Sequence, residues 1–308
     1  MLAQALGRYS WVKPYHASRW SRLAVKTYWK RCKSSLAAEG LPQTDTNKAE
    51  VSLKRFWKDV GIDKRGDNYA VTLDRRALKT PSGNTLLLPK SKQLAASLIA
   101  AEWDHQETLL KPHALPMTSI TSRSIDTFSD PNARREVEEA LLKYFETDTV
   151  CFFDEKAERL DKLQKAHWVP LIEWARSTFG IDVNVSDSVL SPVQPPATKE
   201  KLREVLQSLN SWEMAGKIYE SQCPCSFRAT LTSPLLALER AILSTKSFLI
   251  GLAVVKRYLN VERAAQAASV EVDSQIQVWG EVEDTHDVDY QDVRRQLGSA
   301  ALLLTSSS

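Results

Sequence analysis

The stretch that decides the N-terminal part of the fold is Tyr69-Ala-Val-Thr-Leu-Asp-Arg-Arg-Ala-Leu-Lys-Thr-Pro-Ser-Gly-Asn-Thr-Leu-Leu-Leu88. In it, short runs of strand-forming residues alternate with turn residues, at 74–76 and again at 81–84. The alternation of Tyr69, Val71 and Leu73 predicts a strand with one buried face. Proline presets φ and glycine accepts positive φ, so the turn at 81–84 is expected to close a hairpin. The segment therefore predicts a β-meander, whose first strand we place at Phe56-Trp57.

The hydrophobic period changes after Pro89 to that of helices. Ser91 is predicted to cap a helix over 92–107, and a helix from Asp130-Pro131 is predicted to bury Leu141 and Phe145. Residues 147–153 are predicted to form a connecting strand. Further helices are predicted over 156–179, 198–210, 212–220, 232–245, 246–259 and 262–293. We therefore expect an α+β fold, with a smaller β-containing N-terminal domain over 52–130, a larger α-helical C-terminal domain over 131–298 and a tail over 299–308.

The composition is typical of a globular protein. The 308 residues are 43% hydrophobic and 26% charged, and four cysteines cannot form a dense disulfide framework. The longest apolar run, Phe248 to Val255, is far shorter than the roughly 20 residues that cross a bilayer. We expect no membrane span.

The positive charge is concentrated at the N-terminus. Residues 1–38 contain eight lysines and arginines and no acidic residue, so the overall charge of +3 leaves −5 for residues 39–308. This pattern predicts a mitochondrial transit peptide over 1–40, followed by a polar linker over 41–51. A basic arm for nucleic acid or anionic lipid is the alternative. The acidic remainder disfavours nucleic acid as a partner.

Catalytic signatures are absent from the sequence. It contains no phosphate-binding G-x-x-x-x-G-K-[ST], no G-x-G-x-x-G, no H-E-x-x-H and no G-x-S-x-G. We therefore expect no enzyme activity and no cofactor.

One segment concentrates negative charge. Residues 271–292 contain eight acidic residues and neither Lys nor Arg. If the segment is helical, its inward stripe is predicted to be Val272, Ile276, Trp279 and either Val282 or Glu283. The side chains expected to point outward are those of Glu281, Asp284 and Asp287.

Three interpretations of this acidic segment remain open. It is a solvated face, or a metal site at Glu283-Asp-Thr-His-Asp287, or a surface that binds a basic protein. The metal site lacks a second cluster of His or Cys in the sequence. A separate candidate is Trp103 with Asp104, for which core packing is predicted and a domain seam or partner contact is the alternative.

Seven short motifs, in order, carry a family resemblance. They are Arg55-Phe-Trp-Lys58, Leu73-Asp-Arg-Arg-Ala-Leu-Lys-Thr-Pro81, Ala101-Glu-Trp-Asp104, Pro116-Met-Thr-Ser119, Asp148-Thr-Val-Cys151, Gln275-Ile-Gln-Val-Trp-Gly280 and Glu283-Asp-Thr-His-Asp287. Together they resemble the mitochondrial assembly chaperones that bind the α subunit of the ATP synthase catalytic head. The resemblance spans roughly residues 52–298.

The resemblance implies a non-enzymatic role in the mitochondrial matrix. Its expected partner is the free α subunit, which the chaperone keeps from aggregating until the hexamer assembles, and we expect the chaperone to be a monomer. The family's functional acidic positions match Glu271, Glu283, Asp284 and Asp287 here, and its tryptophan matches Trp103. The predicted partner-binding residues are Glu271, Trp279, Glu281, Glu283, Asp284 and Asp287. The alternatives are a binding module for another basic matrix protein and a metal-dependent hydrolase.

Overall fold

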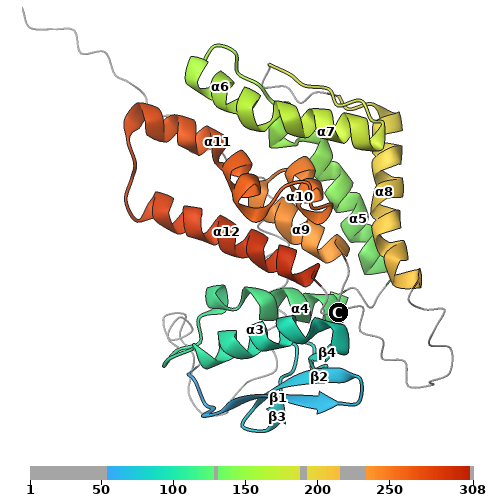
Figure 1. The fold of residues 1–308 in the computed structure, drawn as a ribbon, viewed down its shortest axis with the longest axis vertical. Helices are drawn as coiled ribbons and strands as arrows, with labels where there is room; N and C mark the ends of the chain where they lie inside the picture. The colour runs from blue at the N-terminus through green and yellow to red at the C-terminus, as the bar shows by residue number, and fades with distance from the viewer. Residues whose placement is uncertain (1–53, 128–130, 188–192, 216–233, 306–308) are drawn as a thin grey trace, which may run out of the picture. The chain divides into compact units, whose positions relative to one another are not determined.

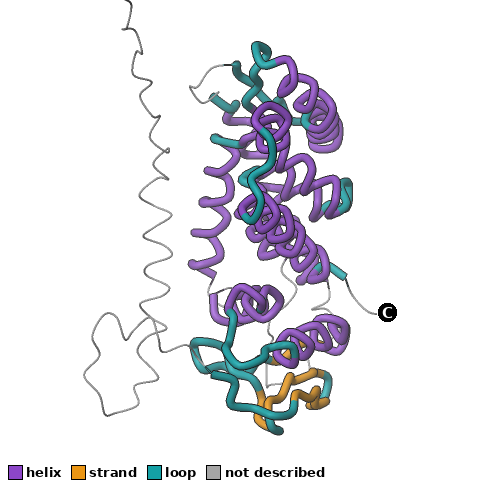
Figure 2. Tube along the Cα trace, turned by 90° about the vertical axis from the view of Figure 1, so that its left-hand side faces the viewer, coloured by secondary structure: helices purple, strands orange, loops and turns teal. Residues whose placement is uncertain are grey.

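The structure is a computed structural model that describes residues 54–127, 131–187, 193–215 and 234–305. The predicted transit peptide and linker lie outside these residues. A small antiparallel sheet opens the described chain and helices make up most of the rest, as Figures 1 and 2 show. The predicted α+β class is therefore confirmed.

The sheet is built around one central strand. β2 (Asn68–Leu73) pairs antiparallel with β1 (Val60–Arg65), β3 (Arg76–Ala77) and β4 (Leu87–Pro89). The predicted turn at 81–84 is present, and Gly83 has the expected positive φ of 87°. The first strand is β1 and not Phe56-Trp57. The prediction of one buried face is also wrong, because Ala70 and Thr72 are buried together with Val71 and Leu73. Their short side chains need little cover from the neighbouring strands.

One helix lies against the sheet and a second helix lies against the first. α3 (Gln93–Asp104) packs on β1, β2 and β4, and α4 (Pro116–Thr127) packs on α3. The predicted Ser91 cap is wrong, because η1 (Lys90–Lys92) precedes α3 and no side chain caps its first turn. α4 was not predicted from the sequence, and its N-terminus is capped by a residue of α3.

The next helices confirm some boundaries and correct others. α5 (Pro131–Glu146) buries Leu141 and Phe145 as predicted. The strand predicted at 147–153 is wrong, because η3 (Thr149–Cys151) occupies its centre and only Phe152 forms a bridge. The helix predicted over 156–179 is two helices, α6 (Glu158–His167) and α7 (Val169–Phe179). Pro170 lies in the first turn of α7 and has no N–H with which to continue the ladder from α6.

The C-terminal helices contain the most deeply buried segment. α8 (Pro196–Ala215) precedes α9 (Pro234–Thr245) and α10 (Phe248–Val255), and α10 is buried from Phe248 to Val254. α10 packs closely on α9, since a Cβ added at Gly251 would lie 2.8 Å from Ile242 Cγ1. In the described residues no helix is long and apolar enough to cross a membrane.

The helix predicted over 262–293 is an antiparallel pair. α11 (Val261–Trp279) ends before Gly280, and α12 (Thr285–Leu303) returns beside it (Figure 1). α12 also packs on α9 and α4 and continues past residue 298, where we placed the end of the helical domain. The domain boundary at residue 130 stays a prediction.

Candidate protein-binding site

The acidic segment forms the connection between α11 and α12. We call residues 271–292 the acidic hairpin and residues 278–288 its tip. Gly280 (φ 87°) ends α11, and Asp284 (φ 67°) precedes α12. Within the tip, the backbone N–H of Val282 donates to His286 Nδ1 at 3.0 Å. His286 therefore holds the turn in shape.

The packed face of α11 differs from the predicted stripe. Its buried residues are Ala264, Ala265, Ala267 and Val270, all in the N-terminal half of the helix. Val272 is exposed, Ile276 is half-buried and Trp279 is 79% exposed. The prediction failed because most side chains of the C-terminal half of α11 remain exposed although α6 reaches this half, where Arg159 donates to the backbone carbonyl of Gln277.

The carboxylates of the acidic hairpin fall into two groups. Asp273 is half-buried, which raises the pKa of its carboxyl, and Asp292 pairs with Arg295. The others are exposed, and none of their side chains has a hydrogen-bond or ion-pair partner among the described residues; they are Glu271, Glu281, Glu283, Asp284, Asp287 and Asp289. These acids include every acidic residue of the predicted partner-binding set.

Arg294, the first arginine after the acidic hairpin, does not neutralise the tip. Arg294 donates two hydrogen bonds to Glu262, at 2.9 and 2.8 Å, and its guanidinium lies 3.3 Å from the ring centroid of Tyr290. The bond from Arg294 also lowers the pKa of Glu262. The tip consequently keeps its negative charge, although the N-terminus of α12 stabilises the acids of its first turn through the helix dipole.

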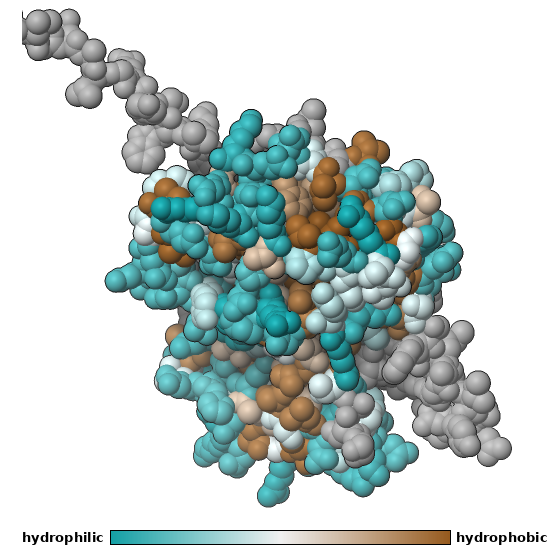
Figure 3. Space-filling view, turned by 45° about the horizontal axis from the view of Figure 1, so that its top comes forward, coloured by the Kyte–Doolittle hydropathy of each residue, from teal (hydrophilic) through white to brown (hydrophobic). Residues whose placement is uncertain are grey.

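Apolar side chains are exposed among these acids. Val278, Trp279, Val282 and Val288 are each more than half exposed. Sequence analysis assigned Trp279 to the partner-binding set but missed the three valines. Val282 was assigned to the interior as an alternative to Glu283, because one continuous helix was assumed. Across the face drawn in Figure 3, hydrophobic side chains lie in separate groups between hydrophilic ones.

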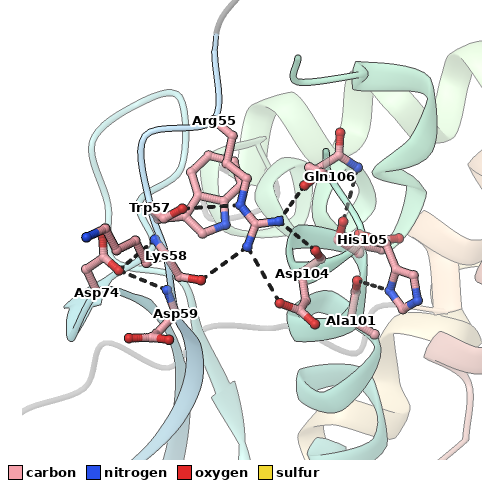
Figure 4. A network of polar contacts seen from close by, with 10 residues as sticks. Arg55, Trp57, Lys58, Asp59, Asp74, Ala101, Asp104, His105 and Gln106 are labelled. Atoms are coloured by element: carbon pink, nitrogen blue, oxygen red, sulfur yellow. Dashed lines mark hydrogen bonds and ion pairs between the residues drawn. The ribbon is translucent and has the colours of Figure 1, made fainter. Parts of the chain in front are cut away.

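A different set of motif residues meets beside the sheet (Figure 4). The Arg55 guanidinium donates to the backbone carbonyls of Trp57, Lys58, Asp104 and Gln106, at 3.2, 3.2, 2.9 and 2.6 Å. It also forms an ion pair with the Asp104 carboxylate at 3.7 Å. We call residues 55–58, 74, 101–106 and 116–119 the motif junction.

Asp74 holds the same junction from the β2–β3 turn. Its Oδ1 accepts hydrogen bonds from the backbone N–H groups of Lys58 and Asp59, at 2.9 and 3.0 Å. These bonds favour the ionised form and lower the pKa of Asp74.

Glu102 and Trp103 join α3 to α4. The Glu102 carboxylate accepts from the backbone N–H groups of Met117 and Thr118, at 2.6 and 2.9 Å, and so caps α4. The indole N–H of Trp103 donates to Thr118 Oγ1 at 3.0 Å, and its ring lies 5.0 Å from that of Trp57. Burial raises the pKa of Glu102 despite its hydrogen bonds. Trp103 and Asp104 therefore contact residues of this chain.

The residues of the motif Asp148–Cys151 also contact this chain itself. Asp148 is fully buried and accepts from the backbone N–H groups of Val150 and Leu249, at 3.0 and 2.9 Å. Burial raises the pKa of Asp148 to about 6. Cys151 is buried as well, which raises the pKa of its thiol.

The acidic hairpin thus differs from the other motifs in what its groups contact. Its acids and apolar side chains face outward, whereas the polar groups of the motif junction and of Asp148 bind this chain's own backbone. In the described part of the chain no group of three or more His, Cys, Asp or Glu residues is placed to hold a metal ion. Exposed charge beside exposed apolar side chains is the chemistry of a protein-binding surface. By fold this is an α+β protein, and its acidic hairpin is the candidate for such a surface.

Comparison with known proteins identifies the family. The profile of the ATP12 chaperone protein family matches residues 54–176. Mitochondrial protein atp12 of Schizosaccharomyces pombe is 32% identical over 297 residues, which cover 94% of this chain and 92% of that protein. Mitochondrial protein ATP12 of Saccharomyces cerevisiae is 28% identical over 301 residues, covering 84% and 86%. The chain belongs to the ATP12 chaperone family, as its motifs predicted.

Solved structures agree with this assignment. Atp12 from Paracoccus denitrificans matches with a TM-score of 0.63 and 25% identity, over 82% of this chain and 97% of that one. A putative chaperone from Agrobacterium tumefaciens shares the fold, with a TM-score of 0.65 and 24% identity, over 82% and 85%.

Proposed function

We propose that this protein is an assembly chaperone of the mitochondrial matrix that binds the free α subunit of the ATP synthase catalytic head through its acidic hairpin. In this proposal it acts as a monomer, keeps the α subunit from aggregating and promotes assembly of the hexamer. It catalyses no reaction. Membership of the ATP12 chaperone family and the mitochondrial names of its relatives support the proposal.

The observation that carries the proposal is the unpartnered charge of the acidic hairpin. Acids that stabilised the monomer would be expected to contact basic residues, as Glu262 contacts Arg294. The acids of the tip have no such contact among the described residues, and they follow the exposed Trp279 closely in sequence. A free subunit of an obligate complex exposes a large apolar surface that tends to aggregate. A surface that combines exposed apolar and charged side chains is suited to cover part of the apolar surface of such a subunit.

The proposal assigns the charge a role in partner choice. Complementary charge speeds encounter and excludes wrong partners, and its effect falls as salt screens it. The hairpin therefore fits a basic region on the α subunit. Another basic matrix protein would satisfy the same charge, and this is the second candidate.

Charge reversal on the hairpin tests the proposal. The variant is Glu283→Lys with Asp287→Lys, and Glu271→Lys is tested separately. Asp284 is left unchanged because lysine at its φ of 67° would add backbone strain. Loss of a charge pair at an interface costs about 2–5 kcal/mol when the partner's charge is left buried, which is roughly a 30- to several-thousand-fold weaker complex.

The matched control reverses two exposed acids elsewhere, Asp59→Lys with Asp63→Lys, which have the same spacing in sequence. Binding of purified α subunit and thermal melting are measured for each variant. We expect the hairpin variants to melt as the unmodified protein does and to lose the α subunit, while the control retains it. Hairpin variants that melt normally and bind the α subunit at full strength would show that the hairpin is only a solvated acidic face.

A further inference from the structure

A cleft lies between α3 and the C-terminal half of α12. It has a volume of about 590 Å³, and the segment 105–114 forms its third side. Its walls are mainly apolar and include Leu98, Ala101, Met117, Gly298 and Leu302. This volume is within the range of sites that hold ligands of several hundred Å³.

Gly298 is an unusual residue for the position it occupies. Glycine inside a helix weakens the helix relative to alanine, so it normally has a packing reason. Gly251 in α10 has one, because an added Cβ would lie 2.8 Å from Ile242 Cγ1. At Gly298 no atom lies within 4 Å of an added Cβ. Contacts within the described chain therefore do not explain Gly298, and the absence of a side chain there leaves space open in the cleft.

The cleft and the tip of the acidic hairpin share one side of α12. At 100° per residue, Val288, Arg295, Ser299 and Leu302 fall on one side of the helix, and Asp287 and Gly298 are separated by only about 20°. Arg295, Gly298, Ser299 and Leu302 line the cleft, whereas Val288 is exposed at the tip. The eleven helical steps from Asp287 to Gly298 span about 16 Å.

We propose that the cleft is the second half of the partner-binding surface and receives an apolar side chain of the α subunit. This inference rests on the proposed function. The same segment of the α subunit places basic residues against the tip and an apolar side chain about 16 Å away, beside Gly298. At the hairpin end of the cleft Arg295 is paired with Asp292 and adds little free positive charge, and the other charged residues of the lining are Glu102, Glu107 and Lys111.

Substitutions that fill the cleft at Gly298 distinguish a role of the cleft in binding from a role in packing. Leucine and alanine are both better helix formers than glycine, and the site has room for a side chain. We therefore expect Gly298→Leu and Gly298→Ala to melt at or above the temperature of the unmodified protein. Gly298→Leu occupies the cleft and should weaken binding of purified α subunit about tenfold or more, a loss of about 1.4 kcal/mol. Gly298→Ala leaves most of the cleft open and should bind within about threefold of normal.

Any other outcome would contradict the proposed role of the cleft in binding the α subunit. A lower melting temperature for Gly298→Leu would show that the space is needed for packing. If Glu283→Lys with Asp287→Lys abolishes binding while Gly298→Leu binds normally, the proposed function stands and the cleft inference is wrong. If the unmodified protein does not bind the α subunit, both are wrong. A self-associating chain that Gly298→Leu converts to a monomer would assign the cleft to a second copy instead.

Discussion

The motif junction and the acidic hairpin are both built from family motifs, yet their charged groups do opposite things. Arg55 and Glu102 bind backbone carbonyls and N–H groups of this chain, and each joins segments far apart in the sequence. Glu283 and Asp287 bind nothing in the described chain. Membership of a motif therefore does not say what its residues do: the polar groups of the junction hold the fold together, whereas those of the hairpin are the proposed contacts to a partner.

This difference between the motif junction and the acidic hairpin has a consequence for the free energy of unfolding of variants in each region. Removing a group that satisfies buried backbone atoms leaves those atoms unpaired, which costs about 1–3 kcal/mol each. Removing an exposed acid without a partner leaves nothing unpaired and relieves repulsion between its neighbours. Substitutions in the two regions are therefore expected to separate stability from binding.

The largest effect is expected for Trp103→Arg. The change removes the ring that lies 5.0 Å from Trp57 and the hydrogen bond to Thr118, and it places a guanidinium among partly buried aromatic groups. Loss of a large packed side chain costs about 3–5 kcal/mol of unfolding free energy. Denaturant unfolding measures this loss, and Trp103→Phe is the control that keeps a ring. Normal stability with lost binding of the α subunit would place Trp103 in the binding surface instead.

Asp148 is expected to give a strong pH dependence. Its folded pKa of about 6 lies above the ordinary value of 3.8 because the carboxyl is buried. As the pH rises the unfolded chain releases this proton first, so the stabilising contribution is complete below about 3.8 and is lost as the pH rises through about 6. The shift corresponds to about 3 kcal/mol.

Comparison with Asp148→Asn isolates this effect, because asparagine does not titrate. The difference in unfolding free energy between the two proteins should move in favour of the variant between about pH 4 and pH 6. Other carboxylates titrate in both proteins and cancel. A difference that stays constant over this range would show that Asp148 ionises normally.

Many of the secondary-structure elements could be predicted from local sequence, and the wrong or missing predictions have physical causes. β2, the turn at Gly83 and the end of α7 at Gly180 were predicted, because strand alternation and positive φ are local properties. α4 was missed because its N-terminal cap, Glu102, comes from another helix. No pattern within residues 116–127 contains that information.

The hairpin was predicted in composition but not in shape. The acids and Trp279 were assigned to the partner-binding set from the sequence, whereas the inward stripe of Val272, Ile276 and Trp279 was wrong. Helical periodicity assigns a side to each residue only where a neighbouring element is present to cover it. Trp279 lies at the end of α11, and the chain reverses at Gly280 immediately after it.

The same substitution in the two regions makes a matched test. Glu102→Gln keeps one acceptor oxygen but loses the charge that strengthens the bonds to Met117 and Thr118, so about 1–2 kcal/mol of stability should be lost. Glu281→Gln removes an exposed charge without a partner and should change stability by less than about 0.5 kcal/mol. Thermal and denaturant unfolding of the two variants measure the two losses of stability directly. Equal losses would mean that the hairpin acids also support the fold.

The smallest effect on stability is expected for Trp279→Ala. The indole is 79% exposed and follows the packed part of α11, so truncating it creates no cavity and leaves no buried group unpaired. The unfolding free energy should change by less than about 0.5 kcal/mol. In the proposed complex, however, Trp279 is the largest exposed apolar side chain of the tip, and tryptophan is among the residues that contribute most to binding. Its removal should weaken binding of the α subunit by about 2 kcal/mol, or roughly 30-fold. Leu243→Ala, a truncation of an exposed apolar side chain of α9 outside the hairpin and the cleft, is the control and should bind within about threefold of normal. Since Trp279 carries no charge, the loss should persist at high salt, whereas the effect of the acids should shrink as salt screens them. A loss that disappears with added salt would assign Trp279 only an indirect role through the neighbouring acids.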